Sequence, residues 1–138
     1  MDFHSLNAVT KRDSRGLGNI DDMVHQMKGA RYMSSIDMAA GYHQIPLRAS
    51  DKPKTAFRTP DGGLWQYTVA PFGLVNLPAQ FTRLMHNTLG SALGAYAMVY
   101  VDDVLIYDDS MEAHITHIRN VLSRIRDAGL SVARHKCQ

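Results

Sequence analysis

The stretch AYAMVYVDDVLIY, residues 95–107, decides how this chain is expected to fold. Two adjacent carboxylates, Asp102 and Asp103, interrupt a run of apolar and aromatic side chains that resumes directly after them. Apolar side chains on both faces of a short segment are typical of covered strands, so the stretch predicts a strand, a tight turn and a second strand. Two like charges at such a turn repel each other and resist desolvation unless a cation or a hydrogen-bond network compensates them.

Two segments nearer the start of the chain have the spacing of apolar residues that is typical of regular secondary structure. Residues 20–27 space their apolar side chains as one face of a short amphipathic helix, with acidic residues in the first turn and Gly29 placed to end it. Residues 32–38 alternate as a half-buried strand does, which puts Ile36 on one face and Asp37 on the other. Asp37 is therefore expected near the end of a strand, on the face away from Ile36.

The middle of the chain predicts a hairpin and a helix. The turn-forming sequence Pro-Asp-Gly-Gly separates residues 55–59 from residues 64–69, a pattern that favours an antiparallel hairpin. Asn76 is a suitable N-cap for a helix that ends at Gly90 and carries proline in its first turn. The apolar stripe expected for this helix consists of Leu77, Phe81, Leu84, Met85 and Leu89.

The last part of the chain predicts a second long helix. Asp109 or Ser110 caps its start and Gly129 follows its end. Its expected apolar stripe consists of Met111, Ile115, Ile118, Leu122 and Ile125. Residues 130–132 have the composition of another strand. Because hairpins and helices mix without strict strand–helix–strand units, the expected fold class is α/β of the α+β kind, an antiparallel sheet packed on helices.

Length and composition limit the classes of function. A chain of 138 residues with 45% hydrophobic and 20% charged residues is expected to form one domain or less. The longest apolar run, residues 93–101, is shorter than the ~20 residues that span a bilayer, and the N-terminus has no signal-peptide pattern, so no membrane partner is expected. The single cysteine, Cys137, cannot form an internal disulfide. Basic residues gather from Arg119 to Lys136, which fits a solvated helix face first and a phosphate-binding surface second.

Three carboxylates carry the chemistry that the sequence suggests. Asp37 ends one predicted strand, while Asp102 and Asp103 lie at the tip of the predicted hairpin, so the three can meet at one edge of the sheet. Carboxylate oxygens are hard ligands that suit Mg²⁺. Two such ions activate an attacking hydroxyl and stabilise the leaving oxygen in phosphoryl transfer. A merely structural turn explains the adjacent pair equally well.

Other candidate clusters have simpler explanations. The acidic pairs at residues 21–22 and 108–109 are expected at a helix start and in a turn. His114 and His117 lie three residues apart on the last predicted helix, but no further ligand pair accompanies them, so exposed helix histidines are expected rather than a metal site.

Several motifs, taken in order, resemble those of one family. They are Ser35-Ile36-Asp37-Met38 with Gly41-Tyr42-His43-Gln44-Ile45, Lys54-Thr55-Ala56-Phe57, Pro71-Phe72-Gly73-Leu74 with Asn76 and Pro78, and Tyr100-Val101-Asp102-Asp103. Their order and spacing closely resemble the reverse transcriptases of gypsy-type long-terminal-repeat retrotransposons and retroviruses. The resemblance covers nearly the whole chain.

The resemblance implies that residues 1–138 form a polymerase palm with part of the fingers. Asp37, Asp102 and Asp103 would be the catalytic residues and would bind two Mg²⁺ ions. Asp37 and Asp102 would bridge both metals, Asp103 would act near the primer, and the backbone carbonyl of Met38 would complete one coordination shell. The partners implied are an RNA or DNA template with its primer and deoxynucleoside triphosphates, whose α-phosphate the primer 3′-hydroxyl attacks.

The resemblance also assigns residues to substrate binding. Tyr42 matches the aromatic ring that lies under the sugar and disfavours a 2′-hydroxyl, although a core tyrosine would fit the same place. Phe72 and Gly73 match the loop that lines the nucleotide pocket, and they would also suit a turn that packs one ring. Tyr100 and Val101 match residues beside the primer terminus and template, and both are ordinary strand residues too.

The sequence departs from the family pattern in places. His4 stands where the family usually has an arginine that is expected to contact the triphosphate, and Gly16 and Gly18 stand where prolines usually stiffen the chain. The chain is expected to lack the thumb and ribonuclease H regions, which a parent polyprotein would supply. These departures favour a rival hypothesis, a catalytically inactive or repurposed fragment that acts as a nucleic-acid-binding or structural module. A second rival is a two-metal nuclease, which needs no triphosphate.

Overall fold

The computed structural model describes residues 2–13 and 20–138. Its helices and strands follow the order α1 (His4–Val9), α2 (Ile20–Gln26), β1 (Tyr32–Asp37), β2 (Phe57–Arg58), β3 (Leu64–Trp65), α3 (Leu77–Leu89), β4 (Ala97–Tyr100), β5 (Asp103–Asp108) and α4 (Met111–Asp127). Short 3₁₀ turns lie between and after them, at η1 (Gly41–Gln44), η2 (Lys52–Thr55), η3 (Gly90–Ala92) and η4 (Arg134–Lys136). Gly16 and Gly18, where the sequence departs from the family pattern, lie outside the described residues.

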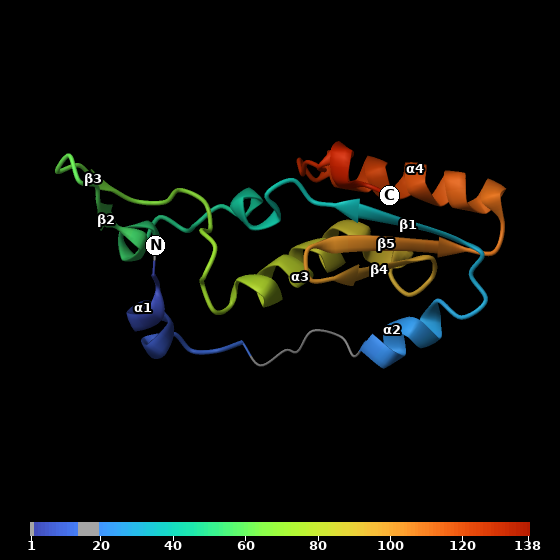
Figure 1. The fold of residues 1–138 in the computed structure, drawn as a ribbon, viewed down its shortest axis with the longest axis horizontal. Coiled ribbons are helices and arrows are strands. Elements are labelled where there is room, and N and C mark those ends of the chain that lie inside the picture. Colours follow the sequence, from blue (N-terminus) through green and yellow to red (C-terminus); the bar gives the residue numbers. More distant parts are fainter. Residues whose placement is uncertain (1, 14–19) are drawn as a thin grey trace.

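The centre of the fold is an antiparallel sheet with the strand order β1-β5-β4 (Figure 1). Strands β4 and β5 are the two arms of the hairpin predicted from residues 95–107, and a two-residue turn joins them. Strand β1 pairs with the other side of β5. The predicted fold class, an antiparallel sheet packed on helices, is confirmed.

The hydrophobic core lies between one face of this sheet and the two long helices. Ile36, Val104 and Val99 are neighbours across β1, β5 and β4, and all three are buried. Helix α3 covers this face with Phe81, Met85 and Leu89, and α4 adds Val121 and Ile125. Each fully buried side chain of this size stabilises the fold by about 1.5–3 kcal/mol. The opposite face of the sheet carries no packed helix from α3 or α4, because both helices contact the same apolar row.

Helix α4 forms as predicted, but it buries a different face. Ser110 is the N-cap, and its side chain accepts a hydrogen bond from the backbone N–H of Ala113 at 3.3 Å. The expected stripe is wrong in part, since Met111, Ile115 and Leu122 are exposed. The face that contacts the sheet instead carries His114, Ile118, Val121 and Ile125. The helix has apolar residues on two faces, and the buried polar group His114 belongs to the face that packs.

Other predicted elements form with shorter bounds. The predicted hairpin exists, but only Phe57–Arg58 and Leu64–Trp65 pair as strands. Helix α2 forms at its predicted place, yet Val24, expected on its apolar stripe, is exposed. Asn76 precedes α3 as predicted without capping it by its side chain, which instead bonds to the backbone of the segment after α1.

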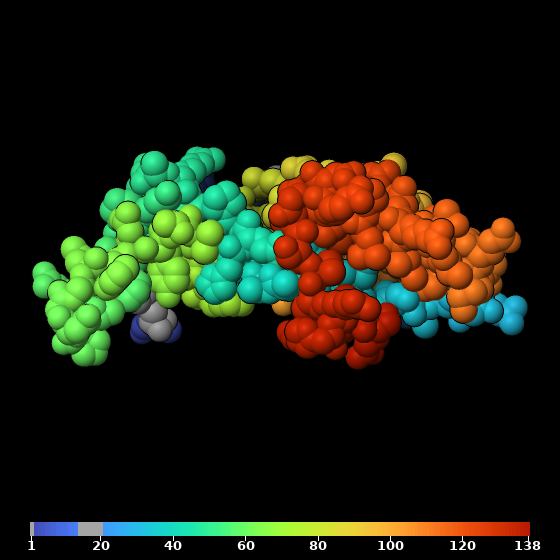
Figure 2. Space-filling model, turned by 90° about the horizontal axis from the view of Figure 1, so that it is seen from above, coloured from blue at the N-terminus to red at the C-terminus, as the bar shows by residue number. Residues whose placement is uncertain are grey.

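The C-terminal segment lies along the free edge of β1. Ser35 and Gln138 exchange backbone hydrogen bonds of 2.8 and 3.0 Å, and the N–H of Ala133 donates to the carbonyl of Asp37 at 2.8 Å. The strand predicted at residues 130–132 is therefore reduced to a single bridge between Val132 and Met38. Figure 2 shows this red segment on the surface beside the cyan residues that follow β1. Within the described part of the chain, no helix is long and apolar enough to cross a membrane.

Candidate active site

The three predicted catalytic carboxylates gather at one corner of the sheet. Asp37 is the last residue of β1 and lies directly opposite Asp103, the first residue of β5. Asp102 occupies the turn just before Asp103. Since Ile36 and Val104 point into the core, their neighbours Asp37 and Asp103 point to the opposite face of the sheet. We call these three residues the acidic corner.

The residues of the acidic corner influence one another electrostatically. Burial raises the pKa of Asp103 above its ordinary value, and the negative charges of Asp102 and Asp37 raise it further. The ammonium of Lys136 acts in the other direction and lowers that pKa. Burial also raises the pKa of Tyr42, and the charge of Asp102 adds to the effect. The corner therefore holds negative charge that its surroundings compensate only in part.

The carboxylate oxygens of the acidic corner suit Mg²⁺, although the three side chains are not close enough together to hold an ion. Register partners such as Asp37 and Asp103 place their Cβ atoms about 4.5–5.5 Å apart, within reach of a shared ion. Over residues 2–13 and 20–138, however, no three His, Cys, Asp or Glu side chains are arranged closely enough to hold a metal. Lys136 lies at this point instead, with its Nζ 3.5 Å from Oδ2 of Asp37. The backbone positions and the oxygen donors fit the ion, and Lys136 contacts one of these donors.

Tyr42 and Phe72 form an aromatic cluster after β1. Tyr42 lies on η1, with its ring edge-on to the fully buried Phe81 at 5.6 Å and to Phe72 at 5.3 Å between centroids. Phe72 also meets the ring of His43 at 4.9 Å and remains 54% exposed. A Cβ on Gly41 would lie 3.2 Å from the Phe81 ring, so any larger residue there would press on this ring and move it by a few tenths of an ångström. The structure thus brings together two residues assigned to the nucleotide site, and Phe72 has a surface free for a further contact.

Gly73 links this cluster to helix α1. Its φ of +98° is in the region that favours glycine, and its carbonyl accepts a hydrogen bond of 2.7 Å from Asn7. Asn7 also accepts from the N–H of Val75 at 2.9 Å. His4, on the same helix, bonds to Asp2 at 2.6 Å and is exposed. The side-chain amide N–H and carbonyl oxygen of Asn7 therefore both bind the loop that carries Phe72 and Gly73.

The remaining predicted residues border the acidic corner. Tyr100 lies opposite Asp103, and is therefore in the same row across the sheet as Asp37. Val101 occupies the first position of the two-residue turn with a φ of +56°. Met38 directly follows Asp37, and its side chain is buried in the core, which leaves only its backbone for a role at the corner.

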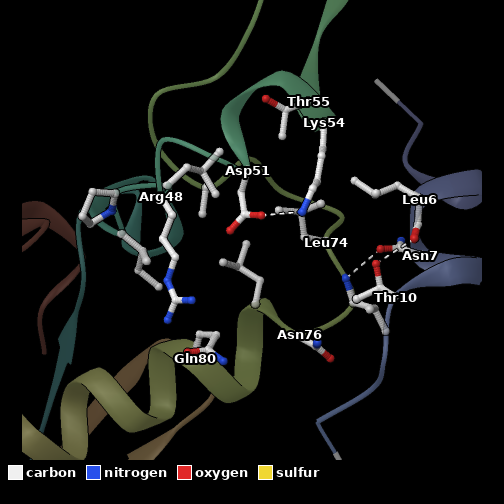
Figure 3. Close-up of a pocket in the computed structure, with 16 residues that line it drawn as sticks. Leu6, Asn7, Thr10, Arg48, Asp51, Lys54, Thr55, Leu74, Asn76 and Gln80 are labelled. Atoms are coloured by element: carbon white, nitrogen blue, oxygen red, sulfur yellow. Dashed lines mark hydrogen bonds and ion pairs between the residues drawn. The ribbon is translucent and has the colours of Figure 1, made fainter.

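A pocket of about 420 Å³ lies elsewhere, between α1, the start of α3 and the segment around η2 (Figure 3). None of the residues of the acidic corner lines it. Lys54 reaches across to Asp51, with 2.6 Å between Nζ and Oδ1, while Arg48 extends toward Gln80. Asp51 thus neutralises Lys54, one of the two cationic side chains that line the pocket. The pocket is separate from the predicted site.

Sequence reasoning missed a polar cluster at the far end of β5. Asp108 is buried and accepts from Nδ1 of His114 at 2.8 Å and from Nδ1 of His117 at 2.6 Å, when each ring carries its proton there. Nε2 of His114 lies 3.0 Å from Oγ of Ser34 on β1. The expectations of an exposed His114 and of Asp108 as a turn residue are wrong. The available signal was an acid two residues before an N-cap, followed by two histidines one helical turn apart.

Comparison with solved structures defines the class of fold. A foamy viral protease-reverse transcriptase in complex with double-stranded DNA superposes with a TM-score of 0.88 at 25% identity, covering 99% of this chain and 24% of that one. A foamy viral protease-reverse transcriptase in complex with an RNA/DNA hybrid gives a TM-score of 0.87 at 25% identity, with 99% and 18% covered. The chain therefore has the mixed α/β fold found in reverse transcriptases.

Sequence comparisons then identify the family. The model of the family described as reverse transcriptase (RNA-dependent DNA polymerase) matches residues 1–138, and the chain belongs to this family. It is 36% identical over its whole length to the retrovirus-related Pol polyprotein from transposon 297 of Drosophila melanogaster, and 31% identical to the transposon Tf2-3 polyprotein of Schizosaccharomyces pombe. The chain spans 13% and 10% of these two relatives. The predicted relation to retrotransposon polymerases is confirmed.

Proposed function

We propose that this chain is the palm, with part of the fingers, of an RNA-directed DNA polymerase that extends a primer by transfer of deoxynucleotides. The observation that carries the proposal is the acidic corner, in which Asp37 lies directly opposite Asp103 and next to the turn that holds Asp102. Asp102 is exposed at this corner, and Asp37 and Asp103 are partly exposed. Family membership supplies the reaction class, template-directed nucleotidyl transfer.

The acidic corner would hold two Mg²⁺ ions through Asp37 and Asp102, with Asp103 on the primer side. When bound, the ions would activate the primer 3′-hydroxyl and stabilise the charge that leaves with pyrophosphate. The carboxylates themselves bind and orient. Because they repel one another in the absence of cations, the corner is ready to bind positive charge.

The aromatic cluster would select and position the nucleotide. Tyr42 is fixed by its edge-on contact with Phe81, so its ring can act as a rigid floor under a sugar that has no 2′-hydroxyl. Phe72 and Gly73, held through Asn7, would line the same pocket. Tyr100 and Val101 border the acidic corner on the side where a primer terminus would lie. The two solved relatives hold double-stranded DNA and an RNA/DNA hybrid, which supports a primer–template as partner.

A second candidate function is a nucleic-acid-binding or structural module that does not polymerise. The observation that favours it is the present state of the acidic corner, where Lys136 contacts Asp37 and the described side chains form no cluster of three metal ligands. This module would keep the fold and bind a primer–template without extending it.

Primer extension with Mg²⁺ and deoxynucleoside triphosphates tests the first proposal. Asp102→Asn should lower the extension rate by more than about 100-fold, because loss of a ligand exceeds the 10- to 100-fold effects of its supporting partners. Asp109→Asn is the matched control, since Asp109 is exposed near the other end of β5. Circular dichroism and primer–template anisotropy should be unchanged in both variants. Equal rates for the wild type and Asp102→Asn would refute the catalytic proposal, and binding without any extension would favour the second function.

A further inference from the structure

Lys136 reaches the acidic corner because the backbone carries it there. It lies on η4, between Ala133, which donates to the carbonyl of Asp37, and Gln138, which exchanges two hydrogen bonds with Ser35. These bonds hold the segment against β1 on both sides of Lys136. Its ammonium therefore lies beside Asp37 although the two residues are 99 positions apart in sequence.

The contact of Lys136 has the character of a replaceable counter-ion. Its Nζ lies 3.5 Å from Oδ2 of Asp37, and the two side chains are 59% and 26% exposed. Exposed ion pairs of this kind contribute about 0.2–1 kcal/mol, so the contact is easily exchanged. The same ammonium also acts on Asp103, the partner of Asp37 across the sheet. Its positive charge thus compensates the negative charge of the whole acidic corner, in the place where a divalent cation would do so.

We propose that Lys136 is a built-in counter-cation that occupies the acidic corner in the metal-free state and is displaced when Mg²⁺ binds. The proposal rests on the proposed function, since it assumes that the corner is a metal site. It explains why the corner has the donors for an ion but no ready-made cluster of three ligands. The ammonium contacts Asp37, so an ion that takes this carboxylate as a ligand has to displace it. The contact between Lys136 and Asp37 thereby opposes metal binding.

The affinity for the metal alone measures this competition. Mg²⁺ titration by calorimetry, checked by electron paramagnetic resonance of bound Mn²⁺, should give Lys136→Gln a dissociation constant lower than that of the wild type by up to about fivefold. Lys136→Arg keeps the charge and should remain within twofold of the wild type. Arg134→Gln is the matched control, because it removes an exposed positive charge from the same 3₁₀ turn without touching the ion pair. Its affinity should not change.

The outcomes separate this inference from the proposed function. Equal or weaker Mg²⁺ binding by Lys136→Gln would overturn the counter-cation, and so would equal tightening by Arg134→Gln, which would show a general charge effect. If wild-type binding is lost in Asp102→Asn, the metal site stands whatever Lys136 does. If neither the wild type nor Lys136→Gln binds the ion, both the metal site and the counter-cation fail.

Discussion

Replacing Val101 with glycine should stabilise the fold, although Val101 lies in the most distinctive motif of the chain. Val101 and Asp102 form the two-residue turn between β4 and β5, and Val101 has a φ of +56°. Of the two turn residues, it alone has positive φ, a conformation that favours glycine at the first central position of a hairpin turn. A β-branched residue in this region of backbone space is strained.

The expected change in the free energy of unfolding is the difference between two opposing effects of the substitution. A side chain with a Cβ loses about 1–2 kcal/mol in the left-handed region, and glycine removes this cost. Glycine also loses more conformational entropy on folding, which lowers the free energy of unfolding by about 0.5–1 kcal/mol. The net gain in the free energy of unfolding should be up to about 1.5 kcal/mol, a rise in melting temperature of up to roughly 5 °C for a chain near this size. Urea denaturation followed by circular dichroism measures it.

Val101→Ala is the control that isolates the backbone effect. Alanine keeps the Cβ and therefore keeps the strain, while it removes the same partly buried methyl groups. Its free energy of unfolding should be equal to or below that of the wild type. If Val101→Gly is no more stable than Val101→Ala, the turn is not strained and the reasoning is refuted. Primer extension should move in the opposite direction and slow in Val101→Gly, because strain at functional sites fixes the groups that do the chemistry.

Two further substitutions test the two ends of β5. Asp103→Asn should raise the free energy of unfolding at pH 7 by up to about 1 kcal/mol, because the raised pKa of Asp103 means that its charged form costs stability in the folded state. The gain should fade as the pH falls through the raised pKa and vanish below the ordinary value of 3.8, so an equal gain at pH 3 contradicts it. Asp108→Ala should lower the free energy of unfolding by about 2–4 kcal/mol, since it leaves the buried His114 without its acceptor. Asp109→Ala, its exposed neighbour, should change it by less than about 0.5 kcal/mol in the same denaturation experiment.

The elements that sequence reasoning predicts well are those whose signal is local. Alternation around Ile36 predicts β1 and the orientation of Asp37, and the apolar residues on both sides of Asp102 predict the hairpin of β4 and β5. Those two results are enough to bring the acidic corner together, because the last residue of β1 pairs with the first residue of β5. Whether the corner binds metal and polymerises remains a prediction.

The features that sequence reasoning misses depend on contacts between distant segments. Helix α4 has two apolar stripes, and spacing alone does not show which one packs. On the packed face, His114 bonds to Asp108 and Ser34 from two different strands, contacts that no local pattern shows. Lys136 gives no local signal either, since its place follows from the pairing of the C-terminal segment with β1.

The two acids at the ends of β5 show how position on a strand assigns a role to one residue type. Asp103 and Asp108 are five residues apart, so their side chains point to opposite faces of the sheet. Asp108 lies on the helix-covered face, where two histidines of α4 satisfy both of its carboxylate oxygens and make it part of the packing. Asp103 lies on the other face among other carboxylates, with the charge of Lys136 acting on it. Negative charge is thus compensated only in part at the Asp103 end of β5, which is why the acidic corner, and not the histidine cluster, is the candidate active site.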